Sequence, residues 1–131
     1  MAYFFNETSH TFNEYLLIPG FYNIHCHAAM TLFRGYGEDL PLQRWLEERI
    51  FPAEDRLTSE SVYYGSMVAI AEMIRNGTVS FSDMYSFLDD TARAVEESGI
   101  KANLSRSIVS FDKDADFTKD ARVLESLDVF N

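Results

Sequence analysis

The chain has 131 residues, of which 47% are hydrophobic and 15% aromatic, and its formal net charge at pH 7 is −10. This apolar content excludes an intrinsically disordered chain and suffices for one small domain with a hydrophobic core. The acidic charge argues against nucleic acid and anionic membranes as partners, because both are bound through basic patches.

Cysteine use and the N-terminal residues indicate the compartment. Cys26 is the single cysteine, so the chain forms no internal disulfide, which fits a reducing environment. The first residues lack the basic start and long apolar core of a signal peptide, and no apolar run approaches the roughly 20 residues that a membrane span needs. We therefore expect a cytoplasmic protein with no membrane partner.

The first half of the chain predicts a strand and a short helix. Residues 1–15 show no clear element, so the folded domain is expected over 16–131. An apolar run predicts a strand over 16–27. A short helix is predicted from Pro41 to the residue before Pro52. One face of this helix is expected to carry Leu42, Trp45, Leu46 and Arg49.

The second half alternates helices and strands. A helix capped by Thr58 or Ser59 is expected to end at Asn76-Gly77. Its apolar stripe is interpreted as core packing and comprises Tyr63, Met67, Ile70 and Ile74. The elements predicted after it are a strand over 78–85, a helix over 89–98 ended by Gly99, a strand over 101–109, and a helix from about Thr118 with Val123, Leu127 and Phe130 on one side.

This alternation predicts an α/β fold with parallel strands joined by right-handed crossovers. In such folds the chemistry lies at the carboxyl ends of the strands. Asp83 on the second strand and Arg106 on the third are candidates there. Each also has a structural interpretation, since Asp83 suits a turn or helix cap and Arg106 suits an ordinary ion pair.

The segment His25-Cys26-His27 closes the first strand. Side chains two residues apart in a strand point to the same face, so both imidazoles project together and Cys26 points to the other side. Two such histidines can supply two nitrogen ligands to one metal ion. The alternatives are that both histidines are ordinary core or surface residues, and that Cys26 is a nucleophile rather than a packing residue.

Several segments of the chain form a recognisable series. The first reads PGFYNIHCHAAMTLFRG over 19–35. The others are 39–42, Trp45-Leu46, Phe51-Pro52-Ala53-Glu54, 71–78 and Phe81-Ser82-Asp83-Met84-Tyr85. Together they resemble the amidohydrolase superfamily, and most of all its branch of 5-methylthioadenosine/S-adenosylhomocysteine deaminases and chlorohydrolases. The resemblance implies a partial (β/α)8 TIM-type barrel, of which the chain carries strands one to three with their helices.

The resemblance also implies a site. His25 and His27 match the first two metal ligands, and Glu54 and Arg106 match residues that contact the substrate. The metal is expected to be Zn, with Fe or Mn as alternatives. The implied reaction is hydrolysis of the exocyclic amine of a purine nucleoside or related heterocycle, with methylthioadenosine, S-adenosylhomocysteine, guanine and halogenated triazines as candidate substrates.

The later ligands and the catalytic glutamate of the family have no match here. The metal ligand set is therefore expected to be incomplete, with no catalytic residue present, and the chain to be an inactive N-terminal fragment. Its open strand edges are expected to cause self-association. The alternative is a non-catalytic remnant or interaction module on a half-barrel scaffold.

Overall fold

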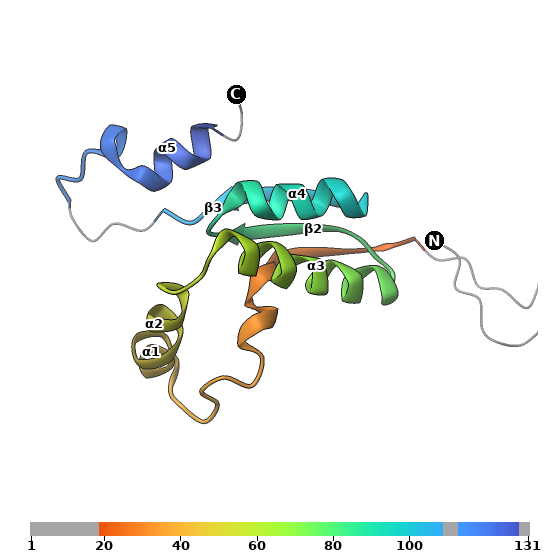
Figure 1. Ribbon diagram of the computed structural model, residues 1–131, viewed down its shortest axis with the longest axis horizontal. Coiled ribbons are helices and arrows are strands. Elements are labelled where there is room, and N and C mark those ends of the chain that lie inside the picture. The colour runs from red at the N-terminus through yellow and green to blue at the C-terminus, as the bar shows by residue number, and fades with distance from the viewer. Residues whose placement is uncertain (1–18, 109–112, 129–131) are drawn as a thin grey trace, which may run out of the picture.

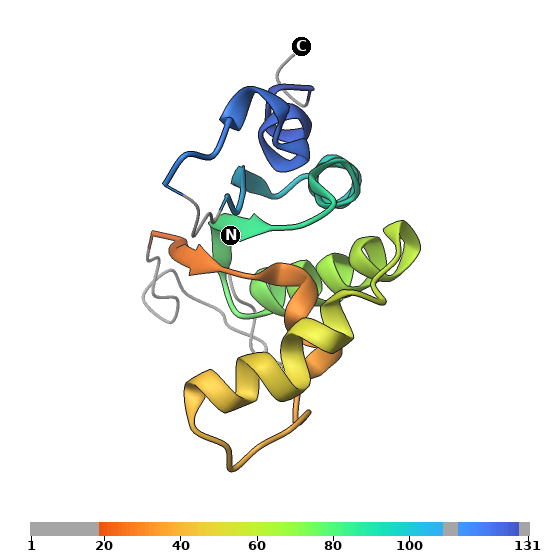
Figure 2. The ribbon, with the colours of Figure 1, turned by 90° about the vertical axis from the view of Figure 1, so that its left-hand side faces the viewer.

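The computed structural model describes residues 19–108 and 113–128, in which three strands form one parallel sheet in the order β1-β2-β3. The strands are β1 (Phe21–Cys26), β2 (Thr78–Tyr85) and β3 (Lys101–Arg106). Helix α3 (Ser59–Arg75) connects β1 to β2, and α4 (Leu88–Ser98) connects β2 to β3. Figure 2 shows α3 and α4 on the same side of the sheet. The predicted parallel α/β architecture is confirmed.

The main core lies between the sheet and these two helices. Phe81 of β2 is only 2% exposed, and the stripe predicted on α3 packs into the same cluster. Helix α3 begins where the sequence predicts, because Thr58 and Ser61 cap its first turn reciprocally. Helix α4 ends at Gly99, whose φ of 72° is the left-handed conformation that glycine adopts without strain.

The helix before α3 differs from its prediction. It runs through α1 (Leu42–Trp45), a π-helical turn (Leu46–Ile50) and α2 (Phe51–Glu54), so Pro52 does not end it. The Phe51 amide donates to the carbonyl of Leu46, five residues earlier. This wider turn adds one residue to the helical face. Ile50 is consequently the buried residue, and Arg49, expected on that face, is exposed.

The edges of the sheet carry exposed apolar side chains. Within the described residues, β1 and β3 each pair only with β2. On β1, Tyr22 is 72% and Ile24 85% exposed. Phe21 of β1 and Ile108, which follows β3, are exposed as well, whereas Phe81 of the central strand is in the core.

Several helices and strands begin or end at residues other than those predicted. Strand β1 is shorter than predicted, and residues 1–18, Val109 and Phe130 lie outside the described residues. A 3-10 turn (Phe117–Lys119) precedes α5 (Ala121–Asp128), which therefore begins later than predicted. No helix among 19–108 and 113–128 has the length and apolar character to cross a bilayer.

Candidate metal and substrate site

The predicted site residues meet at the carboxyl end of the sheet. His27 directly follows β1, and Tyr85 and Arg106 are the last residues of β2 and β3. Figure 1 shows α1, α2 and α5 toward this same end. Parallel strands deliver their ends to one edge, so residues distant in sequence converge there.

The two histidine rings of the first strand are neighbours. Their centroids lie 5.0 Å apart, with the rings at 78° to each other. The Nδ1 atom of His27 lies 2.7 Å from the carbonyl oxygen of Met84. Because a carbonyl only accepts, Nδ1 carries the proton and the lone pair of Nε2 is available to a metal ion. This arrangement fits two of the ligands of a zinc ion.

Asp83 of β2 hydrogen-bonds to the backbone just after the end of β1. It is 2% exposed, and its Oδ1 accepts a hydrogen bond of 2.7 Å from the backbone N–H of Ala28. Burial raises the pKa of this carboxyl above its usual value. Of the two roles proposed from sequence, the turn-stabilising one matches this hydrogen bond.

Cys26 is half-buried and packs against the main core. Burial, followed by the nearby Asp83 carboxylate, raises the pKa of its thiol to about 11. The thiol is therefore protonated at neutral pH, which suits a packing residue and not a nucleophile.

A pocket of about 460 Å³ opens above His27. One wall is apolar and includes Trp45, Leu46 and Ile50. Its polar lining includes Glu54, Tyr85, Arg106 and Arg122. A concave, largely apolar site with a few polar groups is typical of small-molecule binding. Glu54 and Arg106, predicted from separate segments, thus lie on the same pocket.

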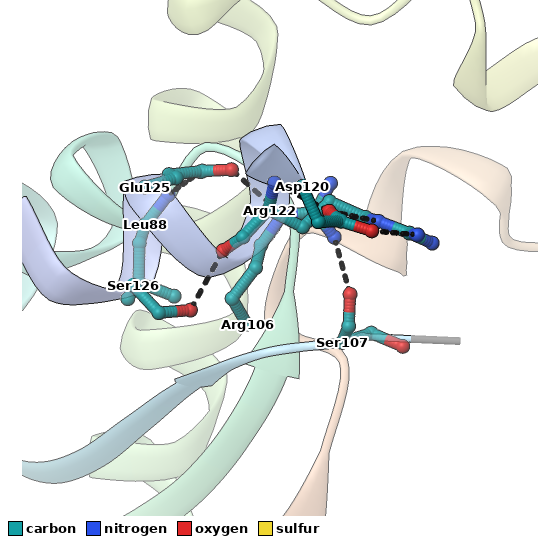
Figure 3. Close-up of polar contacts among 7 residues, drawn as sticks. All are labelled: Leu88, Arg106, Ser107, Asp120, Arg122, Glu125 and Ser126. Atoms are coloured by element: carbon teal, nitrogen blue, oxygen red, sulfur yellow. Dashed lines mark hydrogen bonds and ion pairs between the residues drawn. The ribbon is translucent and has the colours of Figure 1, made fainter. Parts of the chain in front are cut away.

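Both arginines of the pocket are held by carboxylates (Figure 3). The Oε2 atom of Glu125 accepts from Nε of Arg106 at 2.8 Å, and its Oε1 accepts from the backbone N–H of Leu88 at 3.1 Å. Arg122 donates from Nε to Oδ1 of Asp120 at 2.9 Å. The ion-pair interpretation of Arg106 is therefore correct and compatible with its place on the pocket.

The polar pocket residues that sequence reasoning missed include Arg122 and Tyr85. Tyr85 closes a quoted segment and is the residue at which β2 ends, a position that signals a site in this type of fold. Arg122 has no such signal, because it lies on α5, outside the alternating strands. Within 19–108 and 113–128, no three His, Cys, Asp or Glu residues gather as a metal site.

A model of the amidohydrolase family matches residues 16–129. The chain belongs to the amidohydrolase family. It is 54% identical over 103 residues to a 5-methylthioadenosine/S-adenosylhomocysteine deaminase of Dictyoglomus thermophilum, a match covering 79% of this chain and 24% of the relative. It is 50% identical over 113 residues to a 5'-deoxyadenosine deaminase of Methanospirillum hungatei, covering 86% and 25% of the two chains.

A solved structure agrees with this assignment. A zinc-bound adenosine deaminase from Xanthomonas campestris superposes with a TM-score of 0.62 at 42% identity, covering 64% of this chain and 19% of that protein. The expected fold, part of an amidohydrolase (β/α)8 barrel, is confirmed. This amidohydrolase chain spans about a quarter of the length of the curated relatives it matches.

Proposed function

We propose that this chain supplies the first metal-binding strand and part of the substrate pocket of a metal-dependent deaminase. The enzyme would hydrolyse the exocyclic amine of a purine nucleoside. The observation that carries the proposal is the pocket on which His27, Glu54 and Arg106 meet. The names of the relatives support a 5'-deoxy- or 5'-methylthio-adenosine as the substrate.

His25 and His27 would hold the metal, which we propose to be zinc. When bound, zinc acts as a Lewis acid that makes water nucleophilic at neutral pH. The support for zinc is the imidazole ligand pair, the Nδ1–H tautomer of His27 and the zinc in the related adenosine deaminase structure.

Glu54 and Arg106 would both bind the nucleoside in this pocket. A carboxylate accepts hydrogen bonds from sugar hydroxyls, and a guanidinium donates to carboxylate or ring acceptors. The apolar wall with Trp45 offers an aromatic face to a purine ring. Binding on these walls would orient the amine-bearing carbon toward the histidine end of the pocket.

Two further properties belong to the proposal. The exposed apolar residues of β1 support self-association through the open edges of the sheet.

The presence of a single cysteine supports a location in a reducing compartment, which we propose to be the cytoplasm.

A chimeric enzyme tests the function. In it, this chain replaces the matching quarter of the Dictyoglomus relative, which is 54% identical over the replaced region. We expect ammonia release from 5-methylthioadenosine. Glu54→Gln should raise KM about tenfold or more without changing the zinc content, since it removes a charge-assisted contact.

The matched control is Glu96→Gln, which changes the same functional group on an exposed residue of α4. It should leave KM unchanged. A folded, zinc-loaded chimera that releases no ammonia would contradict the proposed reaction. Loss of zinc with an unchanged KM in Glu54→Gln would contradict the role of Glu54.

A further inference from the structure

Tyr85 connects the sheet to the helix that carries Glu54. Its hydroxyl donates a hydrogen bond of 2.7 Å to Oε1 of Glu54. The two residues are 31 positions apart, on β2 and α2. Figure 2 shows α1 and α2 projecting away from the strands, so this bond joins the projecting segment to the sheet.

The ring of Tyr85 is held firmly enough to fix a partner. It is 6% exposed and packs with Ala29 and Val62 in a small buried cluster. Its centroid lies 6.1 Å from the His27 ring. A phenol ring has few rotatable bonds, so a buried tyrosine holds its hydroxyl in one place at little entropic cost.

The hydroxyl of Tyr85 is also a constant donor. Burial, and next its hydrogen bond to Glu54, raise the pKa of this phenol above its usual value. The proton therefore remains on the oxygen throughout the physiological range. An ionised carboxylate is an acceptor only, so the direction of the bond does not change.

The hydrogen bond leaves Glu54 with an available oxygen. Oε1 is occupied by Tyr85, whereas Oε2 makes no hydrogen bond to any residue in the described ranges. Glu54 is half-buried and lines the pocket together with Tyr85. The π-helical turn before α2 places Ile50 in the core and Glu54 one helical turn later on the pocket.

We propose that Tyr85 is a positioning residue for Glu54: its hydroxyl holds one carboxylate oxygen so that the other presents to the nucleoside. This inference rests on the proposed function of Glu54. Tyr85 acts through Glu54 and contributes to substrate binding, with no role in metal binding. Removing the hydroxyl should therefore alter affinity for the nucleoside and leave the zinc content unchanged.

The substitution Tyr85→Phe deletes the hydroxyl and retains the buried ring. Its matched control is Tyr63→Phe, because the Tyr63 hydroxyl donates to Oε2 of Glu97 at 2.6 Å on the outer surface of α3 and α4. In the chimeric enzyme, Tyr85→Phe should raise KM for 5-methylthioadenosine three- to tenfold, with kcat changed less than KM. Tyr63→Phe should change neither constant.

Combining substitutions distinguishes positioning from a general structural role. In a Glu54→Ala background, Tyr85→Phe should have no further effect on KM, because the acceptor is gone. In a Glu54→Gln background the effect should persist, because the amide oxygen still accepts the bond. An equal rise in KM in all three backgrounds, or no rise in any, would overturn the inference.

A second measurement does not depend on activity. Hydrogen–deuterium exchange of the 131-residue chain reports the peptide covering residues 51–57 directly. Tyr85→Phe should accelerate exchange there several-fold, and Tyr63→Phe should not. Unchanged exchange would overturn the positioning role. An inactive chimera with accelerated exchange would refute the proposed reaction and retain the Tyr85–Glu54 link.

Discussion

Tyr85 and Arg106 are register partners at the carboxyl ends of β2 and β3. One register pair of the sheet therefore supplies two of the polar residues that line the pocket. Arg106 contributes its own guanidinium, and Tyr85 contributes the hydroxyl that holds Glu54. Glu54 and Arg106, which we propose bind the substrate and which lie 52 positions apart (106 − 54), are thus linked through a single pair of strand residues.

The tautomer of His27 is the first prediction. We expect nitrogen NMR of the chain to show His27 protonated at Nδ1, since that atom faces the Met84 carbonyl. His27→Ala should lower zinc affinity at least tenfold, and His10→Ala, outside the described residues, should not. An Nε2–H tautomer at His27 in the metal-free chain would refute the assignment.

The second prediction concerns the 131-residue chain alone. We expect no ammonia release from 5-methylthioadenosine above that of a His25→Ala control. Within the described residues two histidines come together without a third His, Cys, Asp or Glu. A catalytic zinc usually takes three protein ligands. Activity that clearly exceeds the control, with zinc supplied, would show that this reasoning is wrong.

The third prediction concerns Glu125, which bridges Arg106 and the first residue of α4. The Arg106 side chain is 16% exposed. Glu125→Ala should lower the free energy of unfolding by about 1–3 kcal/mol, because it removes a charge-assisted bond and leaves a largely buried cation unpaired. Denaturant titration measures this.

The control for Glu125 is Glu48→Ala, which breaks an exposed ion pair with Arg44 one helical turn away. Exposed ion pairs of this kind contribute little to the free energy of unfolding. Equal destabilisation by the two substitutions would mean that Glu125 is an ordinary surface residue.

The fourth prediction is a pH dependence at the start of α5. Hydrogen bonding to the Arg122 side chain lowers the pKa of Asp120 from 3.8 to about 2. A lowered carboxyl pKa stabilises the folded state above the unfolded value and loses this contribution as pH falls toward the folded value. The protection factors over residues 121–128, which are exchange rates corrected for the intrinsic pH dependence of amide exchange, should be constant from pH 7 to about 4 and fall between about 4 and 2.

Asp120→Asn is the control for this pH dependence, because it removes the titrating carboxyl. Its protection factors over residues 121–128 should not change between pH 4 and 2. A transition of the same size in the variant would assign the effect to another group.

The fifth prediction is self-association of the chain, measured by analytical ultracentrifugation at micromolar concentration. β1 presents an edge without a partner among the described strands, and Ile24 on it is 85% exposed. Ile24→Lys should shift the population toward monomer. Val68→Lys, at a 48% exposed position of α3, should not. A sharp monomer peak for the unchanged chain would contradict the prediction.

Local pattern in the sequence determined most of the secondary structure. Strand β2 has the predicted bounds, and α3 begins at the predicted Thr58 cap, because strand alternation and helix caps depend on residues close in the chain. The prediction failed at Pro52, where a π-helical turn carries the helix onward. Helix-ending rules assume that each backbone N–H bonds to the carbonyl four residues earlier. The backbone N–H of Phe51 bonds instead to the carbonyl five residues earlier.

The sequence also supplied the candidates His25, His27, Glu54 and Arg106, but it did not supply their partners. Tyr85 reaches Glu54 across 31 positions, and His27 reaches Met84 across 57. Such contacts depend on how the crossovers pack the strand ends together, and no periodicity within one element encodes them. The sequence by itself therefore determined the residues that we propose for the site, and the tertiary structure decided which neighbours hold each of them in place.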